Sequence, residues 1–320
     1  MISSLKTIDL HQDILLNTKY PDSQKDDSQT SFDMLKAANI KIVLGSVFPI
    51  PPQENFFHPK VNSLITSDIN SYINQCKLDI NFSIIFNKEI LNDIITSQTK
   101  YGIIIHIEGL NVFKDQCSDW RLLENWFNLG LRSIGPIWNL HNSFGGGAQD
   151  NQIGLTSLGH ELIEWAENKG VLIDFAHMNP KTFMGAAKIS NKPILVSHGN
   201  AYDLCSKIRN YDKLQLKQIA ESNGVIGIFF AGNFIKPSGQ LNLQDVVDHF
   251  DYIKKTIGIN HISIGSDFGG IINRKINGLA KSTDLPALYQ TLEKRGYTQN
   301  EIQKISYENA LRVLNSNIQS

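Results

Sequence analysis

Six residues of metal-binding type stand near the ends of apolar runs that are spread along the whole chain. They are His11, Asp13, Glu108, His177, His198 and Asp267. Each follows a stretch rich in Ile, Val or Leu, which is typical of a buried strand. The carboxyl ends of parallel strands meet at one rim of a barrel, so six such residues at equivalent places predict a preassembled site there. Imidazole and carboxylate groups in this mixture suit Zn²⁺, although Mn²⁺, Co²⁺ and Fe²⁺ accept the same ligands.

The spacing of His11 and Asp13 lets them bind one cation together. Alternate side chains of a strand point to the same face, which places this pair on one side and Gln12 on the other. Glu108 comes directly after the apolar segment YGIIIHI and before Gly109. A carboxylate at that depth is costly to bury unless it is paired or bound to a cation. The alternative to a metal is therefore a salt bridge with a lysine or an arginine.

His177 and His198 close two successive predicted strands. Neighbouring strands lie about 5 Å apart, which is within reach of a shared metal, whereas a single histidine at either place is more often a hydrogen-bonded core group. With neutral imidazoles, the charges of Asp13 and Glu108 are outweighed by those of two divalent cations, which leaves room for a hydroxide and a substrate. We therefore predict two divalent metal ions, with Zn²⁺ favoured, that acidify a shared water.

The elements that must position these residues alternate between strands and helices. The β-type runs cover residues 7–15, 40–49, 102–109, 131–138, 170–177, 193–198, 225–232 and 261–267. Helical patterns lie between most of them, as at 155–170, 180–190, 212–224 and 243–258. Strands that alternate with helices imply parallel pairing, and eight such units favour closure into a barrel. We therefore predict the α/β class with a (β/α)8 TIM-barrel fold, formed by residues 1–320 as a single domain.

The composition excludes several classes of partner. A formal net charge of −1 leaves no basic field for nucleic acid or for an anionic membrane. The hydrophobic share of 41% and the charged share of 19% are typical of a globular protein rather than a disordered one. The three cysteines are far apart and lack C-x-x-C spacing, which argues against a disulfide framework and a thiolate zinc site. No apolar run reaches the roughly 20 residues of a membrane span, so a cytoplasmic location is expected.

Several of these segments together resemble one known family. The chain looks like a soluble bacterial-type member of the membrane (renal) dipeptidase family, peptidase family M19, within the amidohydrolase-like barrels. The resemblance extends from DLHQD at 9–13 to ISYENALRVL at 305–314. Its longest matching block is GLTSLGHELIEWAENKGVLIDFAHM, followed by KPILVSHGNAYDLCSKIRN and HISIGSDFGG. No single segment is specific to the family, but the combination is.

The resemblance implies a binuclear zinc hydrolase and divides the predicted ligands between two ions. His11 and Asp13 would bind one zinc, and Glu108 would bridge both ions. His177 and His198 would bind the second zinc. The implied substrate is a small dipeptide, whose amide bond would be cut by a hydroxide that the two ions share.

Two further residues take their roles from the resemblance. Asp267, in GSDFGG, would contact the bridging water and pass its proton to the leaving amine. Arg209, eleven residues after His198, matches the arginine that holds the terminal carboxylate of the substrate. Its planar guanidinium suits a bidentate contact of that kind. The alternative for Arg209 is a solvated surface cation.

The sequence departs from the family's pattern at positions that contact the substrate. The family often carries a histidine after its fourth strand that polarises the scissile carbonyl, and Trp138-Asn139 occupies the equivalent place here. His141 is expected to take over that catalytic role, or Asn139 to donate to the carbonyl instead. The family's D-F-D-G reads D-F-G-G, with Gly269 for the second aspartate, and its H-N-D reads H-Q-D, with Gln12 in the middle.

Three functions stay open at this point. The favoured one is a metallo-dipeptidase. The second keeps the metals but acts on another small amide, a lactone or an ester, because a fold alone does not fix function. The third is a catalytically weak metal-binding regulatory protein, which Gly269 and the altered carbonyl-binding position motivate. The oligomeric state is also open, and a homodimer is among the candidates.

Three other histidines are expected to have structural roles. His160 and His249 fall inside predicted helices and are expected at the surface. His106 shares a strand face with Glu108 and is expected to point into the barrel below the metals.

Overall fold

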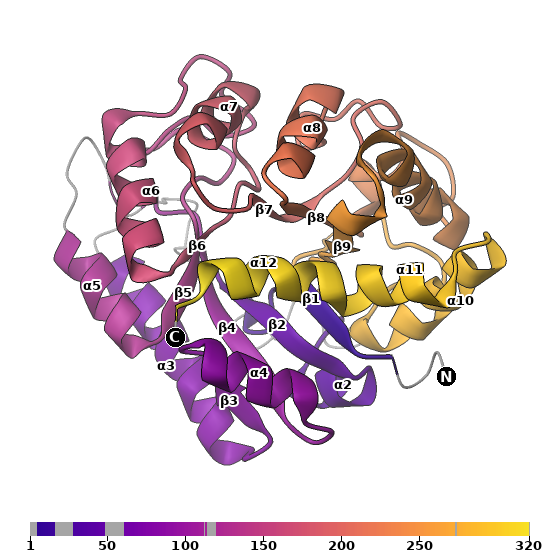
Figure 1. Cartoon of the computed structure of the whole chain (residues 1–320), viewed down its shortest axis with the longest axis horizontal. Helices are drawn as coiled ribbons and strands as arrows, with labels where there is room; N and C mark the ends of the chain where they lie inside the picture. Colours follow the sequence, from indigo (N-terminus) through magenta and orange to yellow (C-terminus); the bar gives the residue numbers. More distant parts are fainter. Residues whose placement is uncertain are drawn as a thin grey trace. The chain divides into compact units, whose positions relative to one another are not determined.

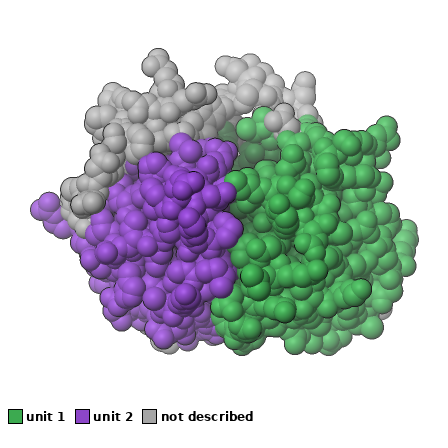
Figure 2. All heavy atoms as spheres, turned by 90° about the horizontal axis from the view of Figure 1, so that it is seen from above, with its two compact units in different colours: residues 1–43, 196–313 green, residues 44–195, 314–320 purple. Residues whose placement is uncertain are grey.

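The computed structural model describes residues 5–16, 28–48, 61–111, 113, 120–272 and 274–319 (Figure 1). These residues fall into two compact units, which Figure 2 colours green and purple. Unit 1 comprises residues 1–43 and 196–313, and unit 2 comprises residues 44–195 and 314–320. The chain passes between the units at three places, inside the strands β2 (Ile40–Val47) and β7 (Leu195–Gly199) and inside the helix α12 (Asn309–Asn317). A single domain over residues 1–320 stays a prediction.

Unit 1 alternates strands with helices along the chain. Besides parts of β2 and β7 it contains β1 (Thr7–Gln12), α2 (Phe32–Ala37), α8 (Lys213–Glu221), β8 (Val225–Ile228), η3 (Gly232–Phe234), α9 (Leu243–Ile257), η4 (Ile259–His261), β9 (Ile262–Ile264), η5 (Ser282–Asp284), α10 (Leu285–Lys294), α11 (Gln299–Gln303), η6 (Lys304–Glu308) and the first residues of α12 (Asn309–Asn317). The strand order is β2-β1-β9-β8-β7, and β9 pairs in parallel with both β1 and β8. The helices α8 and α9 contact each other and cover β8 and β9, respectively.

Unit 2 is built in the same way. It contains α3 (Val61–Leu78), β3 (Phe82–Ile84), α4 (Lys88–Thr96), β4 (Tyr101–Glu108), α5 (Trp120–Leu129), β5 (Leu131–Gly135), α6 (Ser157–Lys169), β6 (Leu172–Ile173) and α7 (Pro180–Ile189). The strand order is β6-β5-β4-β2, and β3 pairs with β4. The pairings β3–β4, β4–β5 and β5–β6 are all parallel. Parallel pairing in both units agrees with the alternation of strands and helices that the sequence predicts.

The predicted helices begin and end at the capping residues of the sequence. α6 begins after Thr156, whose hydroxyl accepts a backbone N–H of the first turn at 3.0 Å, and it ends at Gly170, which has a φ of 68°. α7 follows the cap Asn179 and has Pro180 in its first turn. α9 begins after Asn242, whose side chain accepts two backbone N–H groups. These predicted helices are confirmed.

Each of the eight predicted β-type runs overlaps a strand, but most strands are shorter than the runs. The run 170–177 contains only the two residues of β6, because the chain turns soon after Ile173. A further strand among the described residues, β3, is absent from the prediction. Its three residues lie in the segment NFSIIF, and so short an apolar run is easily overlooked.

The strands supply much of the apolar core. All six residues of β1 and all eight residues of β2 are buried. Full burial of one Ile, Val or Leu side chain contributes about 1.5–3 kcal/mol to stability, so these strands can offset the cost of the polar groups near their ends. Within the described part of the chain, every helix is too short or too polar to cross a lipid bilayer.

Candidate active site

His11 and Asp13 lie together at the carboxyl end of β1 in unit 1. The Nε2 atom of His11 is 3.7 Å from Oδ2 of Asp13 and 3.6 Å from Oδ1 of Asp267. Both His11 and Asp13 are buried, and Oδ1 of Asp13 accepts no hydrogen bond from any described residue. A buried carboxylate oxygen without a donor is costly unless a cation lies against it. The predicted H-x-D pair is therefore brought together in a way that fits a metal ion.

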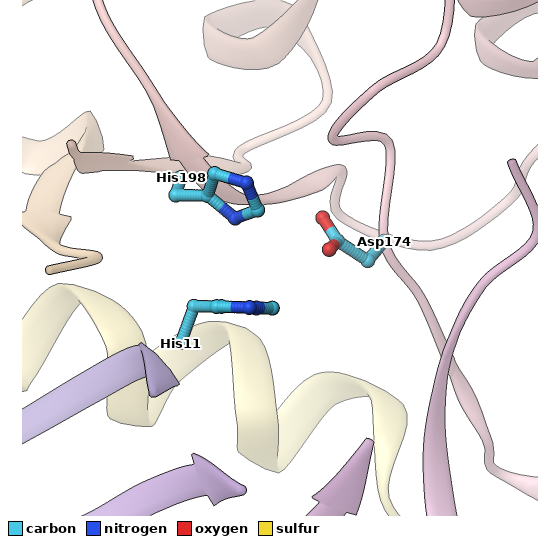
Figure 3. A group of neighbouring side chains, drawn as sticks. All are labelled: His11, Asp174 and His198. Atoms are coloured by element: carbon cyan, nitrogen blue, oxygen red, sulfur yellow. The ribbon is translucent and has the colours of Figure 1, made fainter. Parts of the chain in front are cut away.

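His198 stands near the end of β7 and faces His11. Figure 3 shows the two imidazoles, whose ring centroids are 4.4 Å apart. One ring nitrogen of each histidine lies within 4.8 Å of the other, which is within the span of ligands to a common ion. The hydroxyl of Ser197 is 2.9 Å from Nδ1 of His198, and the ring of Phe229 packs edge-on against the imidazole. These contacts fix the orientation of the ring.

Arg209 contacts His198 directly. Its Nη2 atom is 2.9 Å from Nε2 of His198, and the residue is only 7% exposed. A guanidinium has only donors, so Nε2 of His198 accepts this hydrogen bond. Arg209 is therefore not a solvated surface cation, and that alternative is wrong. The structure places its charge beside one of the predicted metal ligands of unit 1.

Asp267 lies in a tight turn after β9 rather than on the strand itself. Its φ is 61°, and its backbone N–H donates to the carbonyl oxygen of His11 at 3.0 Å. A Cβ atom on Gly270 would lie 2.4 Å from Oδ2 of Asp13 and 2.9 Å from Oδ1 of Asp267, so a side chain at this position would displace one or both carboxylates. Gly269 has a φ of 98°, a conformation that an aspartate rarely adopts. The turn of this chain thus explains the D-F-G-G sequence.

A buried polar network lies behind this end of β1. Gln12 donates a hydrogen bond through Nε2 to Oδ2 of Asp9 at 2.6 Å, and its Oε1 atom accepts a hydrogen bond from the hydroxyl of Thr30 at 2.5 Å. The hydroxyl of Ser266 also donates to Oδ2 of Asp9, at 2.6 Å. Burial raises the pKa of Asp9 above its ordinary value, although the hydrogen bonds oppose this shift. The network joins β1 to the residue that immediately precedes Asp267.

In unit 2, Glu108 and His177 form a close pair. Glu108 is the last residue of β4, and its Oε1 atom is 2.8 Å from Nε2 of His177. The other ring nitrogen, Nδ1, is 3.0 Å from Oδ1 of Asn139. An amide oxygen only accepts, so Nδ1 carries a proton and Nε2 is directed at the carboxylate. Ligands about 2 Å from one ion can be 2.8 Å apart, so the pair fits a shared metal.

The sequence predicts that His177 ends a strand. In the structure it lies instead in a turn, four residues beyond the end of β6. Its φ is 66°, which is uncommon for a residue other than glycine. The glycine-rich loop at 141–151 supports this turn, because the N–H of Ala148 donates to the carbonyl oxygen of His177 at 2.8 Å. A Cβ atom on Gly147 would lie 2.5 Å from the carbonyl oxygen of Asn139, so the loop packs closely there only with glycine.

His141 is placed with Asp150 rather than with Glu108 and His177. Its Nδ1 atom is 2.5 Å from Oδ2 of Asp150, and its side chain is 58% exposed. The backbone N–H of Gln152, and to a lesser extent His141, hold the pKa of Asp150 below its ordinary value. Of the two candidates for contact with a carbonyl, only Asn139 is joined to a predicted metal ligand by a described hydrogen bond.

A buried aspartate near His177 is missing from the predicted set. Asp174, also drawn in Figure 3, follows β6, and its Oδ2 atom is 3.6 Å from Nε2 of His106. The other ring nitrogen of His106 is 2.9 Å from the hydroxyl of Ser133. His106 is buried as expected. The sequence feature that could have identified Asp174 is a charged residue inside the apolar run GVLIDFAHM, three positions before His177.

The expectation for one of the two helical histidines is wrong. The side chain of His160 is 47% exposed, as expected. His249 is only 1% exposed, because it lies on the face of α9 that also buries Val246, Phe250 and Ile253. Residues three and four apart share one face of a helix, and this spacing was the available signal.

Comparison with known proteins identifies the family. The family described as membrane dipeptidase (peptidase family M19) matches residues 1–319, and the chain belongs to it. An uncharacterised protein from the 5′ region of pqqA in Klebsiella pneumoniae is 36% identical over 224 residues. That alignment covers 67% of this chain and 81% of the Klebsiella protein.

Two solved structures share the fold. The crystal structure of dipeptidase AC, a metallopeptidase of family M19, is 23% identical and has a TM-score of 0.87, covering 99% of this chain and 100% of that one. A metallopeptidase from Rhodobacter sphaeroides, liganded with a phosphinate mimic of the dipeptide L-Ala-D-Ala, is 22% identical and has a TM-score of 0.87. This alignment covers 98% of this chain and 99% of that chain. The predicted fold class, an amidohydrolase-like (β/α)8 TIM barrel, is confirmed.

Proposed function

We propose that this chain is a metallo-dipeptidase that hydrolyses the amide bond of small dipeptides with two divalent metal ions, Zn²⁺ being favoured. The observation that carries the proposal is membership of peptidase family M19 over residues 1–319. The sequence also carries all five metal ligands that the resemblance to this family implies, which supports the proposal. The two dipeptide-related structures with the same fold are consistent with it, although their likeness speaks to the fold alone.

Five residues would hold the metals. In this assignment His11 and Asp13 would hold one ion, His177 and His198 would hold the other, and Glu108 would be a ligand to both. All five residues are buried, which supports the assignment. So does Oδ1 of Asp13, which accepts no hydrogen bond from any described residue. The hydrogen bond from His177 to Asn139 leaves Nε2 as the ligand atom. Nitrogen and oxygen ligands in this mixture suit Zn²⁺.

The residues around the metals would divide the chemistry among themselves. Two bound ions would supply an acidified water and a polarised carbonyl. Asp267 accepts the proton of the water as the new C–O bond forms, and it returns that proton to the nitrogen as the C–N bond breaks. Asn139 can donate through its amide nitrogen to the developing oxyanion while its oxygen holds His177. His141 is the other candidate for that contact.

Arg209 would select the substrate by its free carboxylate. A guanidinium presents two parallel N–H groups to a carboxylate, and such charge-assisted hydrogen bonds are strong when buried. The low exposure of Arg209 supports this role. A substrate whose terminal carboxylate must lie at Arg209 is a dipeptide or another short peptide. A neutral lactone or ester has no carboxylate and gains no binding energy from this contact.

The direct test is hydrolysis of a dipeptide panel by metal-loaded protein. The panel contains L-L and L-D dipeptides, because the Rhodobacter relative is liganded with a mimic of L-Ala-D-Ala. Zn²⁺, Mn²⁺ and Co²⁺ are supplied in parallel, and metal content is measured by mass spectrometry. We expect two ions per chain and turnover that a chelator abolishes. Protein with two ions that cleaves no dipeptide would contradict the proposal, and hydrolysis of lactones or esters alone would favour the second function.

A further inference from the structure

His249 is a buried histidine to which the proposed mechanism gives no role. Its Nδ1 atom accepts the backbone N–H of Ala201 at 3.1 Å, and its Nε2 atom is 2.9 Å from the carbonyl oxygen of Ile235. A backbone N–H only donates and a carbonyl oxygen only accepts. The imidazole must therefore be neutral, with its proton on Nε2. Burial agrees with this form, because it lowers the pKa of His249 below the ordinary value.

Ala201 opens the loop that carries Arg209 from β7 towards α8. The N–H of Tyr202 donates to the carbonyl oxygen of Tyr211 at 2.9 Å, and the N–H of Tyr211 donates to that of Asn200 at 2.8 Å. These two bonds close the loop on itself, and Arg209 lies two residues before the closure. The position of the guanidinium therefore depends on where the closed ends of the loop are held.

The loop ends are anchored on two neighbouring elements. Asn200 donates through Nδ2 to the carbonyl oxygen of Phe229 at 3.0 Å, and Asn210 donates through Nδ2 to that of Phe234 at 2.9 Å. Both bonds tie the loop to the segment after β8. His249 ties the same end of the loop to α9, and its second nitrogen holds the segment after β8 as well.

We propose that His249 is a positioning residue for substrate binding, which acts by fixing the closed loop so that Arg209 presents its guanidinium to the substrate's carboxylate. This inference rests on the proposed dipeptidase function. Ala201 is fully buried, so its N–H cannot turn to water when the acceptor on His249 is removed. The end of the loop must then move, and Arg209 moves with it.

Three substitutions separate this role from simple packing. His249→Asn can place its Oδ1 acceptor where Nδ1 lies, whereas the amide of His249→Gln lies one bond further out, at the distance of Nε2, and leaves the N–H of Ala201 without that acceptor. His249→Phe keeps the volume and loses both groups. We expect His249→Phe and His249→Gln to raise the KM for a dipeptide by about tenfold to a hundredfold, with metal content and kcat close to those of the parent. His249→Asn should restore the KM.

The outcomes of this comparison are distinct. A packing role would lower stability in all three variants and would not separate His249→Asn from His249→Gln, which would overturn the proposal. The Asn and Gln pair carries the test if His249→Phe does not fold. His160→Phe, at an exposed helical histidine, is the matched control and should leave KM unchanged. In an Arg209→Ala background, His249→Gln should add nothing further to KM, because both act through one contact.

A second measurement does not depend on the reaction. Hydrogen exchange at the amide of Ala201 reports how often that end of the loop opens. We expect faster exchange there in His249→Gln and parent-like exchange in His249→Asn, in metal-loaded protein without substrate. Equal exchange in the two variants would overturn the anchoring role even if the chain is a dipeptidase. Conversely, faster exchange in a protein that cleaves no dipeptide would refute the proposed function and leave the anchor standing.

Discussion

Asn139 holds His177 by the nitrogen that faces away from Glu108. We expect Asn139→Leu to weaken zinc affinity by about 10- to 100-fold, which is typical for loss of a hydrogen bond to a histidine ligand. The physical reason is that the ring loses the acceptor that keeps the proton on Nδ1. Competition with a chromogenic chelator measures the affinity. Asn139→Asp keeps an acceptor and serves as the control, so equal affinities in the two variants would contradict this explanation.

Gly270 lets the carboxylates of Asp13 and Asp267 approach the same stretch of backbone. A methyl group at this position would collide with Oδ2 of Asp13, at 2.4 Å. We therefore expect Gly270→Ala to lower both metal content and turnover. Gly154→Ala is the matched control, because the nearest atom to its added Cβ would be 3.6 Å away. Parent-like metal content in Gly270→Ala would show that the turn can yield without disturbing the carboxylates.

Arg209 provides a prediction that concerns binding more than chemistry. Arg209→Ala should raise the KM for dipeptides strongly and leave zinc content intact, because Arg209 is proposed to bind the substrate and is not among the five proposed metal ligands. Arg209→Lys keeps the charge but loses the planar fork, so its KM should lie between those of the parent and of Arg209→Ala. Steady-state kinetics on one dipeptide checks the order, and an unchanged KM in Arg209→Ala would remove the carboxylate contact from the proposal.

At the scale of elements, α9 carries a pH-sensitive contribution to stability through His249. Its pKa is lowered by burial, although Asp248 and Asp245 oppose the shift. The unfolded chain therefore binds a proton below about pH 6.5 where the folded chain does not. Stability from this residue is fully present above that pH and is lost as the pH falls towards the folded pKa.

Urea unfolding at pH 7.5 and pH 5.0 can detect this contribution. The free energy of unfolding should fall more steeply towards low pH in the parent than in His249→Asn, which cannot titrate. Burial also lowers the pKa of His261, so some slope should persist in the variant. Identical slopes in the two proteins would mean that His249 does not titrate differently on folding.

The elements themselves were largely predictable from the sequence. Helices such as α6 carry their caps, Thr156 and Gly170, in the sequence, and the longer strands are continuous apolar runs. β3 was not predictable in this way because three residues carry too little periodicity. His177 and Asp267 were recognised as site residues, but both lie in left-handed turns beyond the strands. Such turns depend on distant backbone contacts that a local pattern does not contain.

The partners of the site residues were the least predictable part. The contact of Asn139 with His177 requires a turn that the glycine-rich loop supports, and the contact of Arg209 with His198 requires a loop closed by Tyr211. These contacts follow from how loops fold back, whereas strand ends follow from alternation along the chain. The residues that could bind metal were therefore predictable from the sequence, whereas the hydrogen-bond partners that hold each of them in place were not.

At the scale of the whole molecule, the proposed ligands come from segments far apart in the chain, from His11 to His198. Only folded protein can then bind the metals tightly, so metal should stabilise the fold by about 2.7 kcal/mol at a hundredfold excess over Kd. Thermal unfolding with zinc and with chelator measures the difference. Glu108→Gln should reduce it, while Glu164→Gln, at a side chain that is 64% exposed, should not. An equal effect of zinc on both variants would contradict the role of Glu108.

Because β1 pairs with β9, this edge of β1 can be completed only long after β1 itself is synthesised. Asp9 is paired with Ile264, which leaves the ribosome more than 200 residues later. At roughly 5–20 residues per second, one edge of β1 waits between about ten seconds and a minute for its neighbour. During that interval His11 and Asp13 exist without the turn that carries Asp267. β1 is thus completed by a strand that is synthesised more than 200 residues later, and a nascent chain interrupted before β9 would leave that edge of β1 open to mispairing.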